Sequence, residues 1–127
     1  MKLCFDECMP PKWFGRLSEM LELRKLPIKS THLLQELRSG TQDDAIVQWL
    51  ISQSPHMMII SGDNAQRSGR YDPRLPTLCP QWGVTSVFIG RKLCQREGFE
   101  KVRMIMVCLP ELVAAYEGAR GLRYRLE

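Results

Sequence analysis

Short runs of consecutive apolar residues alternate along the chain with segments whose apolar residues recur every three or four positions. The run at 3–5 predicts a short buried strand, the run at 57–61 is typical of a strand buried on both faces of a parallel sheet, and a further strand is expected at 84–89. After the first run, Trp13 and Leu17 begin a repeat at the four-residue spacing of one helix face. Strands that alternate with helices indicate βαβ units. The pattern therefore predicts an α/β fold, a three-layer α/β/α sandwich with a mainly parallel central sheet and right-handed crossovers.

The remaining elements follow from the same patterns. A strand is expected at 28–32, and the apolar spacing of 33–37 also suits a helix. Asp43 or Asp44 would cap a helix that runs through Ile51. The last predicted segments are a helix face at Phe99, Val102, Met106 and Leu109, a short helix from Pro110 to Tyr116, and an extended tail.

Between 65 and 82 the chain shows no sustained period. Gly69, Pro73, Pro76 and Pro80 interrupt this stretch, which is longer than most connections in compact domains. We therefore predict a loop here, and loops of this length usually carry function.

The composition is that of one globular domain spanning residues 1–127. Apolar residues make up 44% and charged residues 25% of the chain, which excludes the disordered and fibrous classes. The N-terminus reaches Asp6 before any signal-like apolar stretch forms, and the longest apolar run, 104–109, is far shorter than the roughly 20 residues that span a bilayer. We expect a cytoplasmic protein that is not bound to a membrane. The net charge of +4 allows a polyanionic partner without requiring one.

Five cysteines are scattered along the chain without the Cys-x-x-Cys spacing of zinc or redox sites. Reduced thiols in a cytoplasm fit this pattern best. Cys4, Cys8 and His32 could meet around zinc, but a small apolar thiol in a strand or beneath a helix is the commoner arrangement. We therefore interpret these residues as core packing.

Acidic residues directly follow two of the predicted strands. Asp6 and Glu7 come after the first strand, and Asp63 comes after the strand at 57–61. In an open parallel sheet, ligands bind beyond the carboxyl ends of the strands. Asp43 opens the helix that leads into the strand before Asp63, so its carboxylate could reach the same edge.

Each acid also has an ordinary structural role available. Asp43 suits a helix N-cap, Asp63 suits a turn after glycine, and Glu7 suits a solvated position near a helix start. Asp6 fits such a role less well, because an aspartate directly after a buried strand needs a compensating partner. Together, Asp6, Asp43 and Asp63 predict a site for Mg²⁺ or Mn²⁺, since these hard cations prefer carboxylate oxygens. Two such ions about 3.5–4 Å apart would support phosphodiester hydrolysis.

Three motifs resemble those of PIN-like proteins. Residues 2–12, Lys-Leu-Cys-Phe-Asp-Glu-Cys-Met-Pro-Pro-Lys, resemble the first strand of that family, which ends in Asp-Glu-Asn followed by leucine and proline. Residues 40–46, Gly-Thr-Gln-Asp-Asp-Ala-Ile, are similar to the second motif, an aspartate just before an isoleucine-bearing helix. Residues 58–64, Met-Ile-Ile-Ser-Gly-Asp-Asn, are similar to the third, a strand that ends in Thr-x-Asp. The motifs lie in the first half of the chain, and the second half agrees in coarse layout only.

The resemblance implies a metal-dependent endoribonuclease of the PIN superfamily, which includes the VapC-type toxins of toxin–antitoxin systems. It implies that Asp6, Asp43 and Asp63 hold Mg²⁺ or Mn²⁺ and are catalytic, with Glu7 as a further catalytic candidate. The enzyme would hydrolyse RNA phosphodiester bonds.

The same reading suggests partners. Lys12, Arg67 and Arg70 would hold RNA phosphates near the acidic edge, so that binding would weaken with salt. An antitoxin protein would cover that edge or the stretch 65–82, and a homodimer is left open.

Two positions depart from the family pattern. Cys8 stands where asparagine is common, and Ala65 stands where many members have another aspartate. Asp44, Glu7 or Asn64 would then have to supply the fourth ligand. A catalytically inactive PIN-like scaffold that only binds RNA or a protein therefore stays open.

A phosphoacceptor receiver-like signalling domain is the alternative from another class. It also has acids after the first strand, and Asp63 would be its phosphorylated residue. Ser86 and Lys92 could then serve as its hydroxyl and lysine. This reading leaves Asp43 unexplained.

Overall fold

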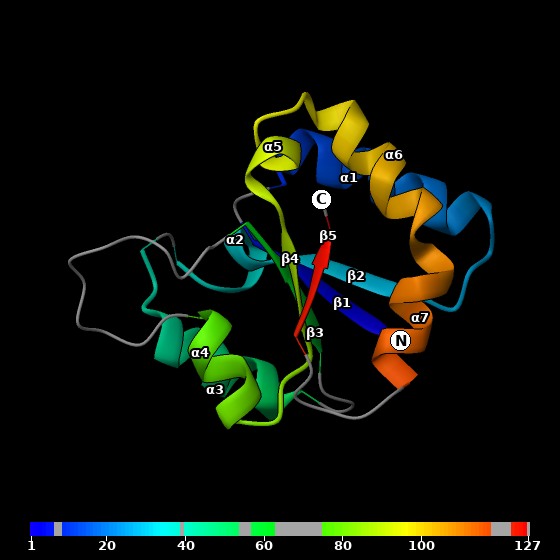
Figure 1. Ribbon diagram of the computed structural model, residues 1–127. Coiled ribbons are helices and arrows are strands. Elements are labelled where there is room, and N and C mark those ends of the chain that lie inside the picture. Colours follow the sequence, from blue (N-terminus) through cyan, green and yellow to red (C-terminus); the bar gives the residue numbers. More distant parts are fainter. Residues whose placement is uncertain (7–8, 39, 54–56, 63–74, 118–122, 127) are drawn as a thin grey trace.

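The computed structural model describes residues 1–6, 9–38, 40–53, 57–62, 75–117 and 123–126, in which strands and helices alternate (Figure 1). The strands are β1 (Lys2–Phe5), β2 (Lys29–His32), β3 (Met58–Ser61), β4 (Ser86–Ile89) and β5 (Arg123–Leu126). The helices are α1 (Pro11–Leu23), α2 (Leu33–Glu36), α3 (Asp43–Ser52), α4 (Leu75–Gln81), α5 (Arg91–Cys94), α6 (Gly98–Val107) and α7 (Leu109–Glu117). No helix within these ranges is long and apolar enough to cross a membrane.

The five strands form one parallel sheet in the order β2-β1-β3-β4-β5. Phe5 pairs with His32 on one side and with Ile60 on the other, so β1, β2 and β3 end at the same edge, which we call the carboxyl edge. The chain leaves β1 toward β2 and then crosses back to β3. The point where the strand order reverses therefore lies between β1 and β3, where doubly wound sheets bind their ligands. The predicted α/β class with a parallel sheet is confirmed.

Both faces of the sheet are buried, because successive side chains of a strand point to opposite faces. Leu3 and Phe5 belong to the core under α1, α6 and α7, whereas Cys4 belongs to the core under α2, α3 and α4. Figure 1 shows these two groups of helices on opposite sides of the sheet. Helices on both faces are consistent with the predicted three layers. They also explain why β3 and β4 are buried at every position.

Helix α1 begins at the carboxyl edge, directly beyond the end of β1. Pro11 occupies its first position, where the fixed φ of proline suits a helix and its missing N–H is not needed. Phe14, Leu17 and Leu21 form its buried face, as the four-residue spacing predicts. The helix ends at Leu23, and Lys25 then turns the chain with a φ of +52°. The first turn of α1 is thereby placed at the same edge as Asp6.

The four crossovers do not all have the same hand. Helix α1 lies on one face and leads from β1 to β2, while α3 and α4 lie on the other face and lead in the opposite direction, so these three crossovers share one hand. Helices α6 and α7 lie on the α1 face, yet they connect β4 to β5 in the same direction as α4 connects β3 to β4. The last crossover therefore has the opposite hand, and the expectation of uniformly right-handed crossovers is wrong for it.

Three local predictions are wrong. Helix α4 lies inside the stretch 65–82 that we predicted as a loop. Phe99, predicted on the buried face of α6, is 49% exposed. Gln42, and not Asp43 or Asp44, is the N-cap residue of α3.

Candidate functional site

Asp6 joins the ends of β1 and β3 at the point where the strand order reverses. Its backbone N–H donates to the carbonyl oxygen of Ile60 at 3.1 Å, which continues the pairing of the two strands by one residue. Its carboxylate accepts a hydrogen bond from the Ser61 hydroxyl, and Oδ1 accepts one from the backbone N–H of Gly62 at 3.4 Å. The side chain is partly exposed. Two donors from the end of β3 therefore orient a carboxylate that solvent can still reach.

The Asp6 carboxylate lies on the face of the sheet covered by α2, α3 and α4. Cys4 points to this face, and Asp6 follows at the two-residue spacing that keeps side chains on one face. Ser61 pairs with Phe88, which belongs to the same core. Among the described helices, α2, α3 and α4 are therefore the ones that could bring a further ligand to Asp6 in a metal site.

Asp43 is the first residue of α3 and lies at the carboxyl edge, because α3 leads back to the start of β3. Its Oδ2 accepts a hydrogen bond from the backbone N–H of Leu75 at 3.2 Å, so it satisfies one of the free N–H groups at the start of α4. The pKa of the Cys79 thiol is raised to about 12, chiefly by burial and to a smaller extent by the negative charge of Asp43. Asp43 therefore connects α3 to α4 and does not cap its own helix.

Glu36 is an acid at this edge that the sequence analysis missed. Its Oε1 accepts a hydrogen bond from the Thr31 hydroxyl at 3.0 Å, at the end of β2. Burial is the main reason that the pKa of the Cys4 thiol rises to about 12, and the charges of Asp6 and then Glu36 add to the effect. Both carboxylates therefore lie near Cys4. The apolar spacing of 33–37 allowed this short helix, but it did not single out Glu36 as part of a site.

The structure places only part of the predicted site. Glu7 and Asp63, and the predicted RNA contacts Arg67 and Arg70, lie outside the described residues. Within the described ranges, no group of three histidine, cysteine, aspartate or glutamate residues is close enough to hold a metal ion. The prediction of a three-carboxylate metal site therefore depends on the residues outside those ranges.

Lys12 is described and lies in the first turn of α1, exposed at the carboxyl edge. Its Nζ lies 5.5 Å from the centroid of the Trp13 ring, a cation–π distance. The charge of Lys12 is therefore held beside an aromatic surface near the acidic edge.

His32 and Cys4 do not form a zinc site. The Nδ1 atom of His32 accepts a hydrogen bond from the backbone N–H of Leu34 at 3.1 Å, so Nε2 carries the proton and donates to the Met9 carbonyl oxygen at 2.6 Å. Cys4 is fully buried, and its pKa of about 12 keeps the thiol protonated. Both side chains serve the core, as the sequence indicated. Cys8 lies outside the described residues.

The receiver-like alternative places its hydroxyl at the wrong edge. Ser86 is the first residue of β4 and pairs with Ile59, whereas the carboxyl end of β3 is at Ser61. Ile59 and Ser61 are two residues apart, and two residues along a strand span roughly 7 Å. Ser86 therefore lies toward the amino end of the sheet relative to Ser61, the last residue of β3.

Comparison of the chain with models of known protein families, with curated proteins and with solved structures finds no match. The fold and the geometry define a class only, an α/β protein whose doubly wound parallel sheet carries carboxylates at its carboxyl edge.

Proposed function

We propose that this protein is a metal-dependent endoribonuclease of the PIN type that hydrolyses RNA phosphodiester bonds with carboxylate-held Mg²⁺ or Mn²⁺. The observation that carries the proposal is the position of Asp6. Its carboxylate lies where the strand order reverses, and donors from Ser61 and Gly62 orient it. Hydrogen bonds of this kind orient the ligands of metal sites, because a free carboxylate rotates and loses its geometry.

Oxygen is the ligand that the described residues offer at this edge. Asp6, Asp43 and Glu36 contribute carboxylates there, while the thiols of Cys4 and Cys79 keep their protons because their pKa values are raised to about 12. This donor set suits Mg²⁺ or Mn²⁺ and does not suit zinc. A bound ion of this kind would neutralise charge on the phosphate and activate water.

In the proposal, Asp6 and Asp63 hold the ion, and Asp43 assists. Lys12 lies in the first turn of α1, where its ammonium can hold a phosphate of the RNA. The toxin role, the antitoxin partner and the homodimer stay predictions.

The test is cleavage of a labelled single-stranded RNA in the presence of Mn²⁺. We expect Asp6→Asn and Asp63→Asn each to lower the rate by more than the roughly 10- to 100-fold that loss of an outer-shell partner costs. Glu22→Gln is the matched control, since Glu22 is an exposed acid at the far end of α1, away from the carboxyl edge. It should keep the wild-type rate.

A second pair of variants separates the two roles of Asp43. Asn at this position keeps an oxygen acceptor for the Leu75 N–H, while Ala removes it. If Asp43 assists the metal, both variants lose cleavage, and only Asp43→Ala is also less stable, by about 1 kcal/mol. Cleavage that persists in Asp6→Asn, or that does not need a divalent ion, would contradict the proposal. Calorimetric Mn²⁺ binding without cleavage would favour the inactive scaffold.

A further inference from the structure

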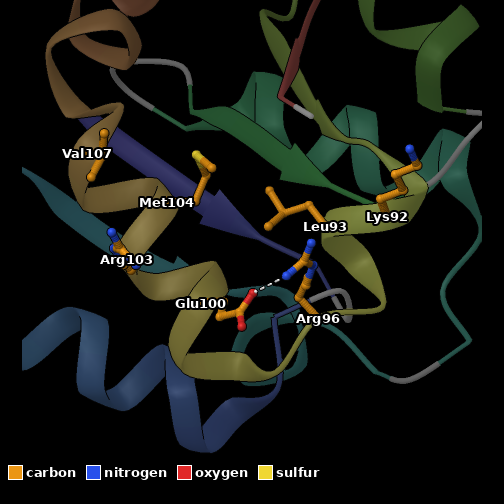
Figure 2. A pocket seen from close by; sticks show the side chains of 7 residues that line it. All are labelled: Lys92, Leu93, Arg96, Glu100, Arg103, Met104 and Val107. Atoms are coloured by element: carbon orange, nitrogen blue, oxygen red, sulfur yellow. Dashed lines mark hydrogen bonds and ion pairs between the residues drawn. The ribbon is translucent and has the colours of Figure 1, made fainter.

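A pocket of about 540 Å³ lies between α5 and α6, on the side of the sheet covered by α1. Figure 2 shows the side chains that line it. Leu93, Met104 and Val107 supply apolar surface, and Lys92, Arg96 and Arg103 supply positive charge. Its volume falls in the range of about 300–1,000 Å³ that is usual for ligand sites.

The charge of this pocket is not balanced. Glu100 is its single acid, and it pairs with Arg96 at 3.2 Å between Oε2 and Nη1. Lys92 and Arg103 form no ion pair with any described residue. Three cations against one acid leave a formal charge of +2 around an open pocket. An anionic ligand is therefore favoured.

An exposed aromatic ring lies beside the pocket. Phe99 precedes Arg103 by four residues on α6, so the two side chains are neighbours on the helix surface. The Phe99 ring is 49% exposed and contacts Trp13, with 6.4 Å between the ring centroids. Trp13 in turn lies so close to Gly98 that a Cβ atom there would overlap its ring. The pairing holds Phe99 in place with part of its surface open to solvent.

The pocket begins at the same edge of the sheet as the candidate active site. Helix α5 directly follows the end of β4, and α6 starts four residues after α5 ends. Figure 1 shows α5 and the start of α1 at the same end of the molecule. A chain bound along the pocket could therefore continue to the edge where Asp6 lies.

We propose that the pocket and Phe99 bind single-stranded RNA, with phosphates at Lys92 and Arg103 and a base stacked on Phe99. This inference rests on the proposed ribonuclease function and names the surface that positions its substrate. Proteins that bind single strands combine cations along the backbone with aromatic rings on which bases stack. An acidic protein segment would also pair with the cations. Such a segment does not need the exposed Phe99 ring beside them, whereas an RNA base can stack on it.

The test is RNA binding measured without cleavage. Fluorescence anisotropy of a short labelled single-stranded RNA in EDTA reports affinity at several salt concentrations. Phe99→Ala and Arg103→Glu should each weaken binding about 10-fold, and Arg103→Glu should also lower the dependence of affinity on salt. Leu23→Ala and Arg24→Glu are the matched controls. They make the same kinds of change at the exposed far end of α1 and should bind as the wild type does.

RNA that carries abasic sites separates stacking from charge. Wild-type protein should bind it about 10-fold more weakly than intact RNA, whereas Phe99→Ala should bind both RNAs equally. Unchanged binding by Arg103→Glu, or equal binding of intact and abasic RNA by the wild type, would overturn the inference. So would tighter binding of an acidic peptide than of RNA at this pocket.

The same measurements distinguish this inference from the ribonuclease proposal. Asp6→Asn should lose cleavage and keep RNA affinity, because Asp6 is not part of the pocket. Cleavage by wild type with no effect of Phe99 or Arg103 on binding would reject the inference alone. Binding with this dependence on Phe99 and Arg103, but no cleavage with any divalent ion, would reject the nuclease alone.

Discussion

At the scale of single residues, two buried thiols lie beneath the carboxylates of the carboxyl edge. The pKa values of Cys4 and Cys79 are both raised to about 12, mainly by burial and in smaller part by the charges of Asp6 and Asp43, respectively. A thiol that keeps its proton is neither a nucleophile nor a good metal ligand. The chemistry of this edge is therefore left to the oxygen atoms above the thiols.

These shifts predict how stability depends on pH. The ordinary pKa of a cysteine, 9.0, applies to the unfolded chain, and the folded pKa of Cys4 is raised to about 12. The stabilisation is fully present below pH 9 and is lost as pH rises toward 12, because the unfolded chain releases the proton first. Each buried thiol should lower the free energy of unfolding by about 1.4 kcal/mol per pH unit in this window. Urea unfolding between about pH 8 and 10.5 should give a shallower slope for Cys4→Ala than for the wild type. Equal slopes would contradict the shift.

The residues of the candidate site were predictable to different degrees. Asp6 was identified because an acid directly after a buried apolar run is unusual, and this signal is local. Its partners Ser61 and Gly62 are 55 and 56 residues away, and they reach Asp6 only through the register of β1 with β3. Register between distant strands depends on the assembled sheet. The sequence could therefore place the acid but not the groups that orient it.

At the scale of elements, the long apolar strands and helices were predicted well and the short or proline-containing ones were not. Helix α4 has seven residues and contains Pro80, so its composition resembled a loop. Its buried residues Leu75, Leu78 and Cys79 form one face only when α3 lies against it. Phe99 fitted the apolar spacing of α6, but the face of the helix that is buried in the structure includes Val102 and Ile105 and leaves Phe99 outside it. Tertiary packing decided both cases.

The contact between α1 and α6 gives a prediction for this scale. Gly98 lies against the Trp13 ring, so a methyl group there must push the two helices apart. Gly98→Ala should lower the free energy of unfolding by about 1–3 kcal/mol, the usual result of overpacking. Gly15→Ala is the control on α1, where nothing lies within 4 Å of an added Cβ. Because Gly15 is exposed in mid-helix, this change should raise stability by about 0.5–1 kcal/mol. Urea unfolding of both variants checks the prediction, and equal effects would contradict it.

At the scale of the whole molecule, the sequence predicted the parallel sheet with helices on both faces but not the hand of its last crossover. Apolar strands of four residues have the same pattern wherever they lie in a sheet. The side on which α6 and α7 pack is decided by the contacts of α6 with α1 and of α7 with α6, which local periodicity does not encode. The strand order, and with it the place where Asp6 meets Ser61, emerges only from the assembled sheet.

Amide hydrogen exchange tests this arrangement. Strands β1 and β3 pair on both sides and are buried on both faces, so their amides should open only with global unfolding and exchange slowest. Strand β2 pairs on one side and should exchange faster. Strand β4 is the decisive element. If the last crossover brings β5 to pair with β4, then β4 is an interior strand of the sheet. If β5 does not pair there, β4 is an edge strand. We expect β4 to be protected like β3. Protection of β4 no greater than that of β2 would mean that β5 does not complete the sheet and that the oppositely handed crossover is wrong.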